Sequence, residues 1–135
     1  MDEKNGKKIV AGIATRRISG KREREILLVE EEGLWELPKV RVSEEMEGLK
    51  ELETYMSETL GMGKIGIKNL YGTVRDHEGD GKTIEAHLVT VYRGTSGSVN
   101  GENSARWFSR GEIGNYDISH TTSRIIRSLK ENSYF

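Results

Sequence analysis

Apolar positions follow two different spacings along the chain, and each change of spacing marks a change of element. Residues 8–16 and 25–30 are apolar, β-branched runs with the length of strands. From residue 43 to 61 the apolar positions instead recur three or four residues apart, as on one face of an amphipathic helix. That face consists of Leu49, Leu52, Met56 and Leu60. The first half of the chain is therefore predicted to form two strands and then a helix.

The second half of the chain shows the same change of spacing. Residues 67–75 and 83–92 are predicted strands, and the second is apolar on both faces toward its end, which is typical of a central strand. A short strand is predicted at 105–109, and a helix at 117–132, where helical spacing returns. This order of elements predicts an α/β sandwich, with a mixed β-sheet between helices.

Local signals mark where the two helices begin and end. Ser43 is a candidate N-cap of the first helix, and Gly61 and Gly63 are candidates to end it. Asp117 or Ser119 is expected to cap the second helix, because both side chains can accept hydrogen bonds from free backbone N–H groups. Both helices are therefore bounded by residues that favour helix ends.

Composition narrows the classes of protein further. With 135 residues, the chain has the length of one domain, residues 1–135, around one core. It has no cysteine, which excludes disulfides, thiolate zinc sites and cysteine nucleophiles. Its 21 basic and 22 acidic side chains nearly cancel, so overall charge indicates neither a nucleic-acid nor a membrane partner. No apolar run is long enough to span a bilayer, and we expect a cytoplasmic protein.

Three segments carry a resemblance to a known family: EGLWELP at residues 32–38, ETLGM at 58–62 and ARWFSRGEI at 105–113. Together with the order of the elements, they resemble the Nudix hydrolase family over nearly the whole chain. The resemblance implies a Nudix-type α/β/α sandwich. It also implies cleavage of a nucleoside diphosphate linked to another group, with Mg²⁺ or Mn²⁺ held by glutamates of one helix.

The Nudix signature can be placed on this chain without a gap, because Pro38 and Gly61 stand at the family's usual separation. In this alignment most residues that carry the chemistry are replaced. The opening glycine falls on Val40, the first glutamate on Met46, the arginine on Thr54, the next glutamate on Tyr55, and the paired glutamates on Glu58 and Thr59. Of the helix's three principal metal-binding carboxylates, Glu58 alone remains.

These replacements leave two functions open. Magnesium prefers oxygen ligands and is usually held by one or two carboxylates together with substrate phosphates. Loss of two carboxylates is expected to lower metal affinity or rate by about 10³-fold or more, since losing even a partner of a ligand costs about 10 to 100-fold. The chain is therefore either a divergent hydrolase of a nucleoside diphosphate derivative with weak activity, or an inactive domain that binds a nucleotide or a protein. A purely structural homodimer module is a third possibility, which no feature of the sequence supports.

Acidic residues on and outside the helix are the candidate ligands and bases. Glu58 is a candidate metal ligand and catalytic residue, and Glu51 and Glu47 are candidate substitute ligands on the same helical stripe. The stripe is also explained as a solvated helix face, made acidic at its start by the helix dipole. Glu85 and Glu102 are candidate catalytic bases outside the helix.

Three residues are candidates for substrate binding. Trp35 is expected either near the nucleotide or packed against the sheet edge, since a partly buried tryptophan can serve either role. Arg16 belongs to a basic segment that can approach substrate phosphates in this family, and that is also explained as a solvated loop. Lys39 directly precedes Val40, the opening position of the signature. Residues 39–42 are predicted to be extended, because valine disfavours the positive φ that glycine allows.

Overall fold

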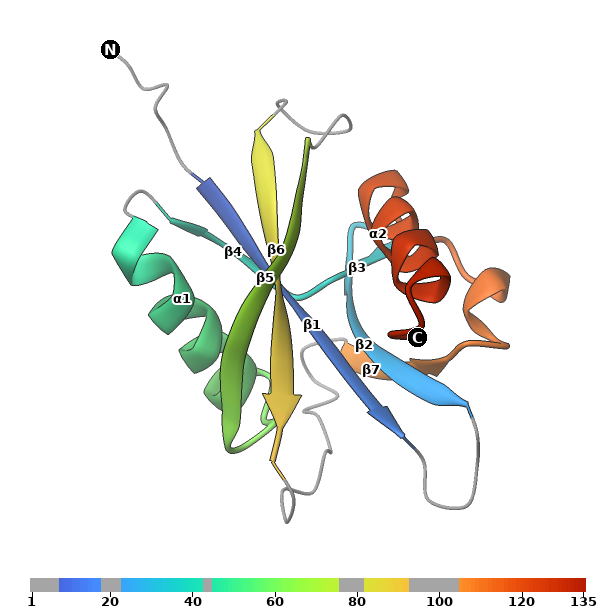
Figure 1. Cartoon of the computed structure of the whole chain (residues 1–135), viewed down its shortest axis with the longest axis horizontal. Coiled ribbons are helices and arrows are strands. Elements are labelled where there is room, and N and C mark those ends of the chain that lie inside the picture. Colours follow the sequence, from blue (N-terminus) through green and yellow to red (C-terminus); the bar gives the residue numbers. More distant parts are fainter. Residues whose placement is uncertain (1–7, 18–22, 43–44, 76–81, 93–104) are drawn as a thin grey trace.

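The computed structural model describes residues 8–17, 23–42, 45–75, 82–92 and 105–135, and the side chains of residues 42–47 are not described. Figure 1 labels the strands and helices, which are β1 (Lys8–Arg17), β2 (Arg24–Glu31), β3 (Leu34–Glu36), β4 (Lys39–Val42), α1 (Glu45–Thr54), β5 (Ile65–Arg75), β6 (Thr83–Val91), β7 (Ala105–Ser109) and α2 (His120–Glu131). Helix α1 continues into a π-helical turn, Tyr55–Thr59, and a 3-10 turn, Ile113–Asn115, precedes α2.

Strand β1 is central to a mixed sheet with the order β3-β2-β1-β6-β5. One edge of β1 pairs with β6 in parallel, and the other pairs antiparallel with β4 along its first half and with β2 at its end. The remaining strands, β3, β5 and β7, each pair antiparallel with a neighbour. β4 and β2 pair with the same edge of β1, one at its start and the other at its end, and they diverge from it (Figure 1).

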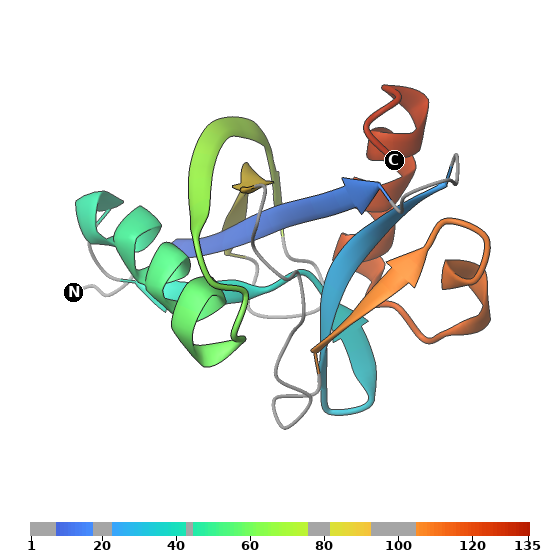
Figure 2. The same cartoon turned by 90° about the horizontal axis from the view of Figure 1, so that it is seen from below.

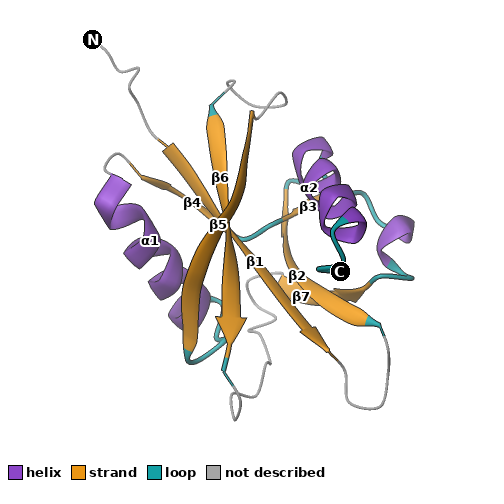
Figure 3. Ribbon diagram, in the orientation of Figure 1, coloured by secondary structure: helices purple, strands orange, loops and turns teal. Residues whose placement is uncertain are grey.

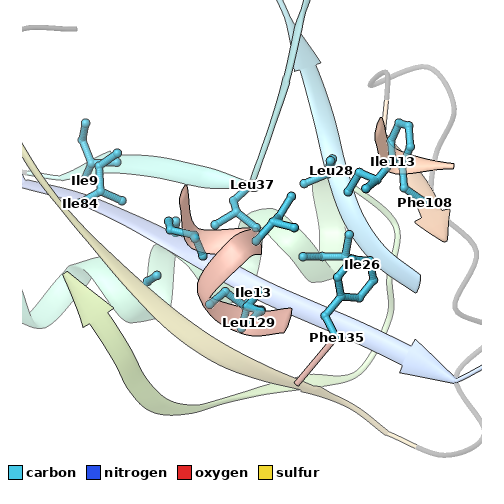
Figure 4. Packing of buried hydrophobic residues seen from close by; sticks show 14 residues of the cluster. Ile9, Ile13, Ile26, Leu28, Leu37, Ile84, Phe108, Ile113, Leu129 and Phe135 are labelled. Atoms are coloured by element: carbon cyan, nitrogen blue, oxygen red, sulfur yellow. The ribbon is translucent and has the colours of Figure 1, made fainter. Parts of the chain in front are cut away.

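One helix covers each face of the sheet (Figures 2 and 3). The side chains of β1 alternate, so that Ile9, Ala11 and Ile13 join the core under α2, whereas Val10 and Ala14 join the core under α1. Figure 4 shows the α2-side core. The α/β/α sandwich with a mixed sheet is therefore confirmed. Neither helix of the described residues combines the length and apolar character needed to cross a membrane.

The strands predicted from periodicity are confirmed with small shifts at their ends. Strand β6 is central, as its two apolar faces predicted, because it pairs with β1 on one side and β5 on the other. Gly61 and Gly63 follow the first helix with φ values of 77° and 80°, which glycine adopts at little steric cost. In α2, the Ser119 side chain accepts a hydrogen bond from the Thr122 N–H at 3.2 Å, so Ser119 is the cap. Ser43 lies outside the described residues.

Two features of the fold differ from the prediction. Strand β3 was not predicted, because Glu32 and Gly33 form the two-residue turn before it with φ values of 52° and 87°, and positive φ is uncommon for glutamate. The expected burial of Leu49 is wrong: 39% of its surface is exposed, whereas Gly48 is buried and Leu52 is fully buried. At the start of α1, the face turned toward the core therefore includes Gly48 in place of Leu49.

Close packing between α1 and β1 depends on Gly12. A Cβ at this position would lie 2.6 Å from the Met56 Sδ and 3.1 Å from a methyl group of Val89. Met56 is itself fully buried in the core under α1, which limits its freedom to move aside. The Gly12 N–H also donates to the Pro38 carbonyl at 2.9 Å, which fixes the chain between β3 and β4. Gly12 thus lets α1, the helix on which the Nudix signature was aligned (the signature helix), pack closely against the sheet.

We expect Gly12→Ala to lower the free energy of unfolding by about 1–3 kcal/mol, because the added methyl group overpacks the core under α1. Urea unfolding followed by tryptophan fluorescence measures the change. Gly72→Ala in β5 is the matched control, since no atom lies within 4 Å of its added Cβ. An equal loss in both variants would contradict the close packing at Gly12.

Candidate active site

The last turn of the signature helix is π-helical, with wider hydrogen bonding than the rest of α1. The N–H of Leu60 donates to the carbonyl of Tyr55, five residues back, at 2.9 Å. This turn, Tyr55–Thr59, contains most of the positions where the Nudix signature concentrates its acids. Single π turns inside α-helices frequently occur at functional sites. The altered helical geometry therefore coincides with the altered part of the signature.

An open cavity of about 580 Å³ lies against this part of the helix, and we call it the α1 cavity. It is lined by Val40, Lys50, Glu51, Thr54, Tyr55 and Thr59. Four of these six residues stand where the signature has its opening glycine, its arginine and two of its glutamates. The fold therefore keeps a space at the signature, lined by two threonines and a tyrosine in place of charged groups.

A smaller cavity of about 150 Å³, here called the acidic cavity, adjoins the first through the shared side chain of Tyr55. Its polar wall comes from the end of β2, from β3 and from β4, and consists of Glu30, Glu31, Glu36 and Lys39, beside Tyr55. The Lys39 ammonium group donates to the Glu36 carboxylate at 2.8 Å. Lys39, expected to bind substrate, is therefore next to the α1 cavity and already holds a carboxylate.

Burial and neighbouring negative charge shift the pKa values of two residues of this wall, Glu36 and Tyr55. Burial raises the pKa of Glu36, and the nearby Glu31 raises it further, while the Lys39 hydrogen bond and charge oppose the shift. Burial also raises the pKa of Tyr55, with a second contribution from the charge of Glu31. Because folded Glu36 holds its proton more tightly than it does in the unfolded chain, its contribution to stability falls as pH rises through its raised pKa.

The three candidate metal ligands of the helix lie in different settings. Glu51 lines the α1 cavity. Glu58 is exposed on the π turn and is not among the lining side chains, and the side chain of Glu47 is outside the described residues. Within the described parts of the chain, no three His, Asp or Glu side chains gather in a way that could hold a metal ion. The described side chains of this region therefore do not form a three-carboxylate metal centre.

The candidate base Glu85 lies on β6 and is held by two neighbours. Its carboxylate accepts a hydrogen bond from the Lys8 ammonium group at 2.9 Å and lies 3.4 Å from Nε2 of His87. Burial would raise the pKa of Glu85, but the hydrogen bonds and charges of Lys8 and His87 outweigh it and lower that pKa. An ionised carboxylate paired with lysine is a weak proton acceptor. The second candidate base, Glu102, lies outside the described residues.

Two of the three candidate substrate contacts are held in structural interactions. The Arg16 Nε donates to the Glu25 carboxylate at 2.7 Å, and the guanidinium group lies 4.3 Å from the ring centroid of Trp107. Trp35 is half-buried beside the core under α2, with its ring edge-on to Phe108 at 4.8 Å between centroids. Neither side chain lines the α1 cavity.

Sequence reasoning missed the acidic cavity and underestimated Tyr55. The alignment marked Tyr55 as the loss of a glutamate, and the structure shows its side chain as a wall shared by both cavities. Glu31 and Glu36 lie on paired strands of a hairpin that the pattern did not predict. The run of glutamates at 30–32 was the available signal, since acids gathered at a strand end can face one site.

The chain was compared with protein families, with curated proteins and with solved structures, and only the last comparison found matches. No family model and no curated protein sequence matches the chain. Among solved structures, it is similar to the Ap4A hydrolase of C. elegans, with a TM-score of 0.68 and 16% identity over 95% of this chain and 96% of that one. It is also similar to the Nudix domain of NrtR from Shewanella oneidensis, solved with ADP ribose, with a TM-score of 0.60 and 15% identity over 93% and 86%. The chain has the Nudix fold.

A longer protein is also among the similar structures. A putative oxidoreductase from Sinorhizobium meliloti 1021 matches with a TM-score of 0.70 and 17% identity over 98% of this chain. The chain spans 41% of that protein's length. At such identities the likeness establishes the architecture, so activity and substrate have to be argued from this chain's own residues.

Proposed function

We propose that this chain binds a nucleoside diphosphate derivative in the α1 cavity and hydrolyses its phosphoanhydride bond weakly. The observation that carries the proposal is that Val40, Thr54, Tyr55 and Thr59, all at signature positions, line one open cavity. Space for a substrate is thus retained where the acids are replaced. The Ap4A hydrolase and the ADP-ribose complex among the similar structures support this class of ligand.

The composition of the cavity wall explains why the proposed activity is weak. Threonine and tyrosine hydroxyl groups form hydrogen bonds, but Mg²⁺ and Mn²⁺ prefer carboxylates and phosphates. Glu51 is the one carboxylate of the described side chains on the wall of the α1 cavity. Metal binding would then depend on phosphates that the ligand brings, with Glu51 as the protein's donor. Glu58 and Glu47 are proposed as further acids of the same helix.

Two lysines lie at the site, one on the wall of the α1 cavity and one in the adjoining acidic cavity. Lys50 lines this cavity and is proposed to contact a ligand phosphate. Lys39 lies in the adjoining acidic cavity, where it can exchange its bond to Glu36 for a phosphate. Roles for Arg16 and Trp35 in substrate binding stay predictions, as do those of Glu85 and Glu102 as bases.

The test is a panel of ADP-ribose, Ap4A, nucleoside triphosphates and nucleotide sugars, each with Mg²⁺ and with Mn²⁺. We expect a rise in Tm with at least one ligand, and slow turnover that falls about tenfold in Glu51→Gln and in Glu58→Gln. Glu53→Gln is the matched control, because Glu53 is an exposed acid of α1 that lines neither cavity.

The outcomes separate the two functions. A ligand that raises Tm without any turnover supports a binding domain in place of an enzyme. Turnover that is equal in Glu51→Gln, Glu58→Gln and Glu53→Gln contradicts the roles of the two acids. If no ligand raises Tm and none is hydrolysed, the proposal fails.

A further inference from the structure

A second large cavity lies under α2, on the face of the sheet opposite α1, and we call it the α2 cavity. Its volume is about 490 Å³, and it lies between α2, β3 and the segment that joins β7 to α2. These three elements lie together at the right of Figure 1. The cavity is open, and Leu34, Ile113, Ile118 and Ile126 form the apolar part of its lining. A cavity of this size and lining accommodates a small organic molecule.

The aromatic wall of the α2 cavity, Tyr116, is fixed by neighbours outside it. The Arg106 guanidinium group donates to the Tyr116 hydroxyl at 3.0 Å and lies 4.9 Å from the ring centroid. Phe108 packs edge-on against the same ring at 4.9 Å between centroids. The tyrosine therefore has a set orientation before any ligand arrives, which lowers the entropic cost of binding.

The backbone around this wall is also held in place. The Trp35 N–H donates to the Asp117 carbonyl at 2.8 Å, and the Ser119 N–H donates to the Trp35 carbonyl at 3.0 Å. These two bonds join β3 to the segment before α2, and so connect two sides of the cavity. The segment that supplies Tyr116 and Asp117 to the cavity is therefore anchored to β3 through its backbone.

Two cations lie on the α2 side of this cavity. Arg127 and Lys130 are three residues apart, which places both on one face of the helix, and both line the cavity. Neither group has a carboxylate partner among the described residues. The helix dipole favours a cation near the end of α2 but does not account for the cavity beside it. Asp117 adds one negative charge to the lining.

We propose that the α2 cavity binds a small molecule that joins a planar ring to a phosphate group. The ring packs between Tyr116 and the isoleucine side chains, and Arg127 and Lys130 bind the phosphate, whose two charges match theirs. Asp117 accepts a hydrogen bond from a donor group on the ring. This site lies across the sheet from the α1 cavity and shares no lining residue with it, so binding here is independent of the proposed hydrolysis.

Phenyl phosphate is the probe for this site, titrated into the full chain and followed by ¹H–¹⁵N NMR. We expect a Kd of about millimolar or tighter, with shifted amide signals for Gly114, Ser123 and Arg127. The double variant Arg127→Gln, Lys130→Gln is expected to weaken binding about tenfold or more, because two charge-assisted hydrogen bonds are lost. Arg124→Gln is the matched control, an exposed cation of the same helix that does not line this cavity.

Several outcomes would overturn the proposal. One is the absence of shifts up to about 10 mM probe. Another is equal binding of inorganic phosphate, which would show that the ring is not recognised. Shifts confined to the α1 cavity, or equal weakening in the double variant and in Arg124→Gln, would place the binding elsewhere. The readout needs no enzymatic activity, so it is independent of the test of hydrolysis.

Discussion

Replacing both Tyr55 and Thr59 with glutamate is expected to raise Mn²⁺-dependent hydrolysis of ADP-ribose by about 10²-fold or more over the original chain. Both side chains line the α1 cavity, and both stand where the Nudix signature has a glutamate. With Glu51, the variant would present three carboxylates to one cavity, which are the oxygen donors that Mg²⁺ and Mn²⁺ prefer. Steady-state kinetics of the original and substituted chains measure the gain.

The same substitution is expected to lower stability in the absence of metal. Tyr55 also lines the acidic cavity, where the charge of Glu31 already contributes to raising its pKa. A carboxylate at position 55 would meet the charges of Glu31 and Glu36, and like charges at close range repel. Added Mn²⁺ would neutralise this repulsion, so Tm should fall without Mn²⁺ and recover with it. Thermal unfolding with and without Mn²⁺ measures both effects.

Ser57→Glu is the control for restored carboxylates, because it adds a charge to the same π turn without lining either cavity. It should give no gain in hydrolysis and no recovery of Tm with Mn²⁺. If the double substitution at Tyr55 and Thr59 gives no stabilisation by Mn²⁺, the α1 cavity does not bind a metal ion. If it binds Mn²⁺ but stays inactive, the missing acids are not what limits hydrolysis.

Periodicity predicted the architecture well because each element buries one face, and burial repeats with the geometry of that element. β1 shows this directly, since its alternating residues enter two separate cores. The method failed at Leu49 because Gly48 and Leu49 lie on either side of Leu52 around the helix, and the apolar pattern selects the leucine whereas the structure buries the glycine. The π turn that begins at Tyr55 is a separate departure, which the positions of apolar residues do not encode.

The location of the α1 cavity followed from the sequence more closely than its chemistry. Pro38 and Gly61 fixed the alignment of the signature, and four of the positions assigned in this way line one cavity: Val40, Thr54, Tyr55 and Thr59. The acidic cavity could not be found in the same way. Glu31 and Glu36 become neighbours through pairing across a hairpin whose turn includes Glu32 at positive φ. The local sequence pattern shows a run of acids at 30–32 but does not predict the strand pairing that brings Glu31 and Glu36 together.

Leu52→Ala is expected to lower the free energy of unfolding by about 2–5 kcal/mol, whereas Leu49→Ala should change it by about 0.5 kcal/mol. Leu52 is fully buried in the core under α1, so its truncation leaves a cavity there, while Leu49 is 39% exposed. Urea unfolding of both variants measures the difference, and each variant is the control for the other. Comparable losses would mean that α1 packs with the face that the sequence pattern predicted. Because α1 supplies Lys50, Glu51 and Tyr55 to the α1 cavity, the orientation tested here also decides which side chains can meet a ligand.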